Sequence, residues 1–375
     1  MNKKVLGILL VSFFSVGVII GHYKILPSQY LHEIRESIFT DEEDKFQAYI
    51  YENNISRLIH IHSPDDAIVK RELLVNYIWP IDGFPYERKP KVETAITDSR
   101  YDDIDNLGRI DRITINMDYE VNSIAYLFMP HTPHKTLIIY HQGHDGDFIL
   151  GKKTIQYFIE RDYPVLAFSM PLLGMNNQPI VDIPNLGMIK LKSHNDFIYL
   201  ESSRFSPVKF FVEPIAISLN HMDELEFDSY IMLGISGGGW TTTMYSAIDS
   251  RVLESYSIAG SVPTFLRSIP GNEGDYEQKI PTLYNITNYL DLYILSSFGD
   301  DRKHVEIYNK YDPCCFGGDI SKTYENEIKT NMLKLGSGKF MVYIDDTHKE
   351  HKISRFSLDI IKDSINEKQK IESIN

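Results

Sequence analysis

The chain contains very little cysteine. Its 375 residues include only two, Cys314 and Cys315, and these are adjacent. A framework of several disulfides is therefore excluded, and a bond between neighbouring cysteines would be strained and easily reduced. We expect small, buried, free thiols here, in a fold that depends on its hydrophobic core.

Positive charge is also scarce. The sequence has 38 lysines and arginines against 52 aspartates and glutamates, which gives a formal net charge of −14. An acidic surface repels phosphate backbones, so nucleic acid is not expected as a partner. The acidic residues form short runs, as at 41–44, which is typical of solvated loops and helix ends.

Internal repeats and low-complexity segments are absent from the sequence. Hydrophobic residues make up 43% of the chain and charged residues 24%, which is ordinary for a globular protein. A chain of this length can fold as one large α/β domain or as two smaller domains.

An apolar run occupies the N-terminus. It extends from Val5 to Ile20 after Lys3 and Lys4. The run is long for a signal-peptide core, short for a membrane span, and not followed by an Ala-x-Ala site. We therefore predict a signal anchor over residues 1–24, with a cleaved signal peptide as the alternative. The lysines would remain in the cytoplasm, so the rest of the chain would be membrane-anchored outside it, or secreted.

Residues 25–104 have a weaker pattern. Apolar residues recur at near-helical spacing between 27 and 63, and Pro80, Pro85 and Pro90 then mark loops. We expect a small extension of helices and loops in this segment.

From residue 105 onward, short apolar strands alternate with helical stretches. Strands that are apolar throughout are buried on both faces, which is typical of a parallel sheet. The pattern predicts an α/β domain over 105–375, with a mostly parallel central sheet and helices on both faces. The expected strands are 109–117, 123–129, 136–140, 164–169, 229–233, 254–259, 303–308 and 340–344, and the expected helices are 154–160, 207–219, 240–247, 324–335 and 353–365.

Ser236 lies in the sharpest motif of the sequence. Residues 234–240 read Gly-Ile-Ser-Gly-Gly-Gly-Trp, with a buried strand before them and a helix after them. This context predicts a tight strand-to-helix turn that presents the serine hydroxyl, with glycines where side chains would collide with backbone. We predict Ser236 as the nucleophile and the Gly237 amide, at the helix N-terminus, as an oxyanion donor.

The glycine-rich segment has two alternative interpretations. A phosphate-binding P-loop is disfavoured because no lysine follows the glycines at the required spacing. A glycine-rich turn without chemistry stays open from the motif alone. The motif in its context resembles the nucleophile turn of the α/β-hydrolase superfamily, which implies further residues elsewhere in the chain.

The resemblance implies a second oxyanion donor in the loop after the third strand of the fold. Residues 140–144 read Tyr-His-Gln-Gly-His, and Gly143 permits a close backbone approach to a reacting carbonyl. The amides of Gln142, Gly143 and His144 are all candidates, and we favour Gly143. His141 and His144 could also bind a metal, but no third ligand with suitable spacing occurs, so neither a metal nor a cofactor is expected.

The resemblance also implies the order nucleophile, acid, histidine along the chain. Asp312 follows the strand at 305–308, and Pro313 would stiffen the turn that presents it. Asp300 and Asp301, which follow the apolar stretch 293–297, are the alternatives. We favour Asp312, because it leaves room for one more strand and helix after the nucleophile.

The general base should follow the last strand. His351 lies next to the start of the closing helix, and His348 lies three residues earlier in the same loop. We favour His351 over His348. In this assignment the histidine takes the proton of the serine and the aspartate orients the imidazole.

Residues 105–365 resemble, within the superfamily, the acetyl-xylan-esterase-like and prolyl-oligopeptidase-like catalytic domains. The resemblance carries the roles of nucleophile, acid and base to Ser236, Asp312 and His351, but it carries no substrate. The oxyanion loop reads His-Gln-Gly-His where the superfamily often has His-Gly-Gly-Gly. The 80 residues at the N-terminus are too few for the β-propeller of an oligopeptidase.

The leading hypothesis is a carboxylic-ester hydrolase that acts outside the cytoplasm on a small acylated molecule, lipid or glycan. A serine peptidase for short peptides and a membrane-tethered, non-catalytic binding protein are the alternatives. Residues 172–205 are apolar and rich in loops. They could line an acyl pocket or form a surface excursion, and the oligomeric state cannot be read from the sequence.

Overall fold

The computed structural model describes residues 55–267, 274–314 and 316–372. The predicted signal anchor over 1–24 lies outside these residues. Among the helices of the described ranges, none is both long and apolar enough to cross a bilayer.

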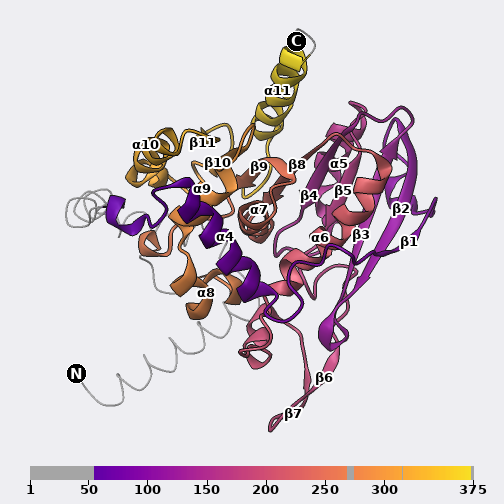
Figure 1. Cartoon of the computed structure of the whole chain (residues 1–375). Coiled ribbons are helices and arrows are strands. Elements are labelled where there is room, and N and C mark those ends of the chain that lie inside the picture. The colour runs from indigo at the N-terminus through magenta and orange to yellow at the C-terminus, as the bar shows by residue number, and fades with distance from the viewer. Residues whose placement is uncertain (1–54, 268–273, 315, 373–375) are drawn as a thin grey trace, which may run out of the picture. The chain divides into compact units, whose positions relative to one another are not determined.

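A nine-stranded sheet forms the centre of the described unit (Figure 1). Its spatial order is β1-β2-β3-β5-β4-β8-β9-β10-β11. Strands β1, β2, β3 and β5 pair antiparallel, and the pairs from β5 through β4 to β11 are parallel. The strands are β1 (Lys91–Glu93), β2 (Leu107–Asn116), β3 (Asn122–Pro130), β4 (Thr136–His141), β5 (Val165–Phe168), β8 (Ser229–Ile235), β9 (Val252–Ile258), β10 (Lys303–Asn309) and β11 (Lys339–Asp345).

The register of the parallel strands brings their carboxyl ends to one edge. His141 at the end of β4 is paired with Gly234 near the end of β8, and Asn309 of β10 is paired with Asp345 of β11. The chain turns from β4 to its neighbour β5 and then crosses to β8 on the other side of β4. Open α/β sheets bind ligands at such a reversal, beyond the carboxyl ends of the strands.

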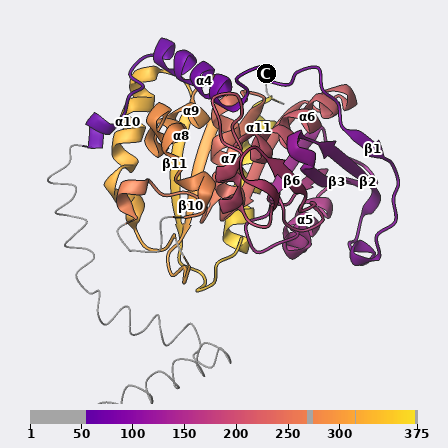
Figure 2. The same ribbon diagram turned by 90° about the horizontal axis from the view of Figure 1, so that it is seen from below.

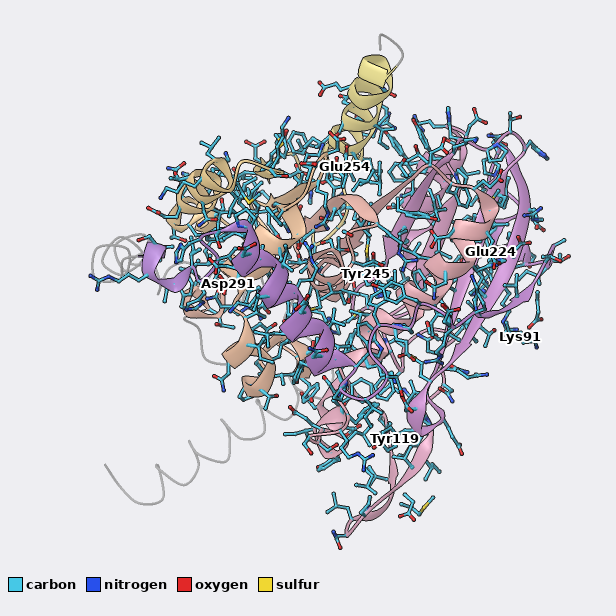
Figure 3. All side chains as sticks on the ribbon, in the orientation of Figure 1. Lys91, Tyr119, Glu224, Tyr245, Glu254 and Asp291 are labelled. Carbon is cyan, nitrogen blue, oxygen red and sulfur yellow. The ribbon has the colours of Figure 1, made fainter. Side chains whose placement is uncertain are left out.

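Helices cover both faces of the sheet. Apolar side chains of α5 (Lys152–Ile159) and α11 (Arg355–Glu372) share one buried core with strands β2 to β10. The helices α6 (Lys209–Met222), α7 (Gly237–Ile248), α9 (Tyr289–Ser297) and α10 (Glu325–Leu335) contact the strands without joining that core. Ser364 of α11 donates a 2.8 Å hydrogen bond to Glu254 of β9, which lies beside the base of α11 in Figure 3.

The segment 55–104 belongs to the same compact unit as the strands and helices after residue 105. Its helix α4 (Pro64–Ile78) packs on α7, α8 (Pro281–Ile286) and α9, on the side of the sheet opposite α5 (Figure 2). Just before α4, the amide and Nδ1 of His60 lie 2.8 and 2.9 Å from the carboxylate of Asp291, which Figure 3 labels. The predicted extension thus contributes α4 and β1 to this unit.

Every strand and helix that the pattern predicts after residue 105 is present within three residues of its expected bounds, except that the closing helix α11 (Arg355–Glu372) ends seven residues later than expected. The apolar stretch 293–297, however, is the end of helix α9, which is buried along its whole length and so shows no polar face. The short hairpin of β6 (Ile180–Ile183) and β7 (Gly187–Lys190) was not predicted. It extends from the rest of the unit with Ile180 and Met188 exposed (Figure 1).

Candidate active site

Ser236 occupies a strained turn between strand β8 and helix α7. Its backbone angles are φ 55° and ψ −127°, a conformation that non-glycine residues rarely adopt. The amide of Ser236 donates to the Ile258 carbonyl at 3.0 Å, and its carbonyl accepts from the Trp240 amide at 3.0 Å. The strained backbone is thus fixed from both sides, and the side chain stays partly exposed.

Two glycines make this turn possible. A Cβ atom on Gly234 would clash with the carbonyl oxygen of Gly238, and one on Gly238 would clash with the carbonyl oxygen of His141. The steric argument made from the sequence therefore applies at both positions.

The loop after β4 lies against the turn. A Cβ on Gly143 would be 2.8 Å from both the Ile235 carbonyl oxygen and Ser236 Cβ, and 3.5 Å from Ser236 Oγ. The Gln142 amide donates to the Phe168 carbonyl at 2.9 Å, which leaves Gly143 and His144 as candidate oxyanion donors in this loop. The Gly237 amide begins α7, where amides have no acceptor within the helix.

Asp312 and His351 form a tight pair in the loops after β10 and β11. His351 Nδ1 lies 2.6 Å from Asp312 Oδ2, and the Asp312 side chain is fully buried. His351 Nε2 is buried without a hydrogen-bond partner, so it is not bonded to Ser236 Oγ in this structure. The pair thus presents one imidazole nitrogen that no protein group uses.

The alternative acids, Asp300 and Asp301, and the alternative base, His348, lie in surroundings that differ from those of Asp312 and His351. Asp300 and Asp301 are exposed, and Asp300 accepts a 3.0 Å hydrogen bond from Ser337. His348 Nε2 lies 3.2 Å from Asp345 Oδ2. Neither alternative acid is paired with a histidine, whereas His348 is paired with a second aspartate.

The loop that carries His351 is anchored by a residue that sequence reasoning missed. The side-chain nitrogen of Asn309 donates to the carbonyl oxygens of Lys352 at 3.0 Å and Glu350 at 3.4 Å. Asn309 is completely buried at the end of β10. A polar residue at the end of a buried strand is the only signal that the sequence offers for this role.

The prediction of buried, free thiols is wrong for Cys314. This residue is exposed and disulfide-bonded, and its amide donates a 2.7 Å hydrogen bond to Asp312 Oδ1. Burial would have kept a thiol away from oxidants, and an exposed loop does not. The Cys314 backbone thus fixes the second oxygen of the acid.

A second set of ionisable side chains adjoins the turn. A Cβ on Gly237 would meet the His144 ring, and His144 Nε2 lies 2.8 Å from Glu277 Oε1. His194 Nδ1 lies 3.2 Å from the other oxygen of Glu277. His194 and Glu277 were missed because 83 residues separate them in the chain, with no motif around either.

The pKa values of Glu277, His144 and His141 are shifted from their usual values. Burial alone would raise the pKa of Glu277, but His194 and His144 hold it far below its usual value. Burial alone would lower the pKa of His144, but Glu277 and Asp275 raise it. Burial lowers the pKa of His141 to about 4, so this histidine is neutral at physiological pH.

Similarity to known proteins is found in the structure and not in the sequence. No family model matches the chain, and no curated protein matches it in sequence. An acetyl xylan esterase from Paenibacillus sp. R4 matches in structure with a TM-score of 0.54 at 13% identity, over 83% of this chain and 97% of that one.

Two further solved structures agree. Acetyl xylan esterase 1 from Thermoanaerobacterium sp. has a TM-score of 0.51 at 13% identity, over 83% of this chain and 96% of that one. A putative acetyl xylan esterase from Bacteroides fragilis has a TM-score of 0.53 at 13% identity, over 76% of this chain and 77% of that one. The chain thus has the α/β-hydrolase fold that its motifs predicted.

Proposed function

We propose that the chain is a serine hydrolase that cleaves carboxylic esters, with Ser236 as nucleophile, His351 as general base and Asp312 as its acid. One observation carries the proposal. Ser236 is held in a strained conformation at the carboxyl end of β8, and the loops that carry the His351–Asp312 pair begin at the same edge of the sheet. Strain of this kind persists in proteins mainly where function requires it.

The first step is acylation of the serine. Ser236 Oγ attacks the carbonyl carbon of the ester while its proton passes to His351 Nε2. Asp312 accepts a hydrogen bond from the Nδ1–H of His351, which fixes the tautomer and stabilises the imidazolium. The amides of Gly237 and Gly143 donate to the negatively charged oxygen that forms.

The second step releases the products. The bond from the carbonyl carbon to the alcohol oxygen breaks, and His351 Nε2 returns its proton to that oxygen. Water then attacks the acyl-enzyme and loses a proton to His351 Nε2. The bond from the acyl carbon to Ser236 Oγ breaks, His351 returns the proton to Oγ, and the carboxylic acid leaves. The chemistry assigned to these residues uses no cofactor.

We further propose short acyl groups, acetyl above all, as the acyl part of the substrate. The support is that the three fold neighbours described above are named acetyl xylan esterases. A peptidase remains the alternative reaction for the same nucleophile. Action outside the cytoplasm is part of the proposal and rests on the apolar run 5–20 after two lysines. The disulfide at Cys314 agrees with an oxidising compartment.

The test is labelling and turnover in one preparation. The purified full chain is treated with a fluorophosphonate probe and assayed on p-nitrophenyl esters from acetate to dodecanoate, beside Ser236→Ala and the exposed control Ser250→Ala. We expect wild type and Ser250→Ala to be labelled and to hydrolyse acetate fastest, and Ser236→Ala to do neither. A folded wild type that shows neither would refute the enzyme and favour a binding protein. Labelling without ester turnover would point to peptides.

A further inference from the structure

Two histidines and two carboxylates converge beside Ser236, apart from the proposed Ser236, His351 and Asp312. His144 comes from the loop after β4, and His194 begins the short helix η5 (His194–Tyr199). Glu277 lies in the short helix η8 (Tyr276–Gln278), and Asp275 is the residue immediately before this helix. Three loops that are remote in the sequence thus supply one mixed set of nitrogen and oxygen atoms.

The atoms are spaced as ligands of one small ion. Ligand atoms of His144, His194 and Glu277 all lie within 4.8 Å of one another. His144 Nε2 is 2.8 Å from Glu277 Oε1 and 3.1 Å from Asp275 Oδ2, and His194 Nδ1 is 3.2 Å from Glu277 Oε2. Tetrahedral zinc with bonds of about 2.0–2.1 Å separates its ligand atoms by roughly 3.3 Å, so small shifts would admit the ion.

His194 gives the second, independent observation. Its Nε2 lies 3.0 Å from the Pro171 carbonyl oxygen, which can only accept, so Nε2 carries a hydrogen. Its Nδ1 lies 3.2 Å from Glu277 Oε2, and the His194 side chain is only 4% exposed. With the hydrogen on Nε2, a neutral imidazole has a lone pair on Nδ1, which is the arrangement that coordinates a metal ion. Metal-bound histidines typically donate their other N–H to a backbone carbonyl in this way.

Charge balance points to a divalent cation. The Glu277 side chain is completely buried, and Asp275 adds a second negative charge at the rim. Two carboxylates and two neutral imidazoles are neutralised by a single 2+ ion, which avoids the cost of a buried imidazolium. The partly exposed side chains of His144 and Asp275 leave an entry path from solvent.

We propose that His144, His194 and Glu277 bind one divalent transition-metal ion, with zinc the best match. Two imidazoles and a carboxylate suit zinc, whereas calcium and magnesium prefer sites made of oxygen atoms alone. The ion would link the loop of Gly143 and His144 to η5 and η8. Because the His144 ring packs against Gly237, the metal would stabilise the position of the oxyanion loop. The binding itself does not depend on the proposed hydrolase activity.

The test measures metal on the purified full chain. The protein is stripped with a strong chelator, loaded with Zn²⁺, and dialysed, and its zinc content and Kd are measured by mass spectrometry and by competition with a chromophoric chelator. We expect one zinc ion per chain and a Tm that rises with zinc. The variants Glu277→Gln and His194→Gln should bind at least about tenfold more weakly, because each removes a ligand.

Two control variants make the result specific. Glu306→Gln alters another completely buried glutamate–histidine pair, in which Glu306 Oε1 lies 3.0 Å from His304 Nε2, and it should bind zinc as wild type does. Ser236→Ala should also keep its zinc, which separates this proposal from the hydrolase. Should the cluster variants fold poorly, Co²⁺ on wild type should give the visible spectrum of a tetrahedral site. A folded wild type without saturable binding, cluster variants that bind as tightly as wild type, or a Co²⁺ spectrum without tetrahedral features would each overturn the proposal.

Discussion

The side-chain nitrogen of Asn309 lies 3.0 Å from the carbonyl oxygen of Lys352, the residue that follows His351. A buried strand end thereby sets the position of the proposed base. We expect Asn309→Ala to lower kcat on p-nitrophenyl acetate by on the order of 10- to 100-fold, because small displacements of a catalytic group are costly. KM should change little, since Asn309 is not proposed to contact substrate.

The control for this variant is Asn331→Ala. Asn331 is also buried, and its side chain donates to the Ile61 carbonyl at 2.8 Å, on helix α10. Both variants should lose about 1–2 kcal/mol of unfolding free energy, but only Asn309→Ala should lose kcat. Equal kcat losses in the two variants would show a general structural effect and contradict the positioning role.

The assignment of acid and base predicts unequal effects within two pairs of residues. Asp312→Asn should lower kcat by on the order of 10³- to 10⁴-fold, because the amide favours the wrong tautomer of His351. Asp300→Asn, on an exposed side chain, should leave kcat unchanged. His351→Gln should abolish most turnover, and His348→Gln should not. Steady-state kinetics with p-nitrophenyl acetate measure all four, and a severe loss in Asp300→Asn or His348→Gln instead would reverse the assignment.

The sequence predicts those parts of the fold that depend on residues close together in the chain. The run from strand β8 through the glycines to α7 is local, so the tight turn at Ser236 could be expected from steric rules alone. Asp312 and His351 were proposed from the chain order that the resemblance implies, and the structure pairs them at 2.6 Å in the loops after β10 and β11, two parallel neighbours. Helix α9 was missed because it is buried on all sides, and a fully buried helix has no amphipathic period.

The cluster beside the turn could not be predicted in the same way. His144 and Glu277 are 133 residues apart, and neither belongs to a spaced metal motif. Their contact depends on the paths of loops, for which hydrophobic periodicity carries no information. The sequence showed His141 and His144 without a third ligand, whereas the structure brings His194 and Glu277 to His144 and points His141 at its own neighbour, the Gln142 carbonyl.

The close packing of Gly143 leads to a prediction for the loop after β4, which carries a proposed oxyanion donor. A methyl group there would be 2.8 Å from the Ile235 carbonyl oxygen and Ser236 Cβ, so Gly143→Ala must displace the loop. Loss of one oxyanion donor typically lowers kcat by about 10²- to 10³-fold, and we expect a decrease of that size, measured as kcat on p-nitrophenyl acetate. Gly108→Ala, on strand β2, is the control and should retain wild-type kcat. A Gly143→Ala variant with normal kcat would remove this loop from the mechanism.

The lowered pKa of His141 leads to a prediction about how the free energy of unfolding depends on pH. Its side chain is buried, and burial lowers its pKa from 6.5 in the unfolded chain to about 4 in the folded protein. Below pH 6.5 the unfolded chain therefore takes up a proton that the folded protein refuses. The free energy of unfolding therefore falls as the pH drops from 6.5 toward 4. Above and below that range, His141 adds no further pH dependence.

Urea unfolding at pH 7 and pH 5 measures the effect. The His141 contribution should destabilise wild type by about 2 kcal/mol on going to pH 5, and the variant His141→Gln should lack that part of the pH dependence because glutamine does not titrate. His134→Gln, at an exposed histidine, should keep the wild-type dependence. If His141→Gln and wild type lost equal stability between the two pH values, His141 would have to be protonated in the folded protein. The buried loop that presents Gly143 would then carry a positive charge next to the site of the oxyanion.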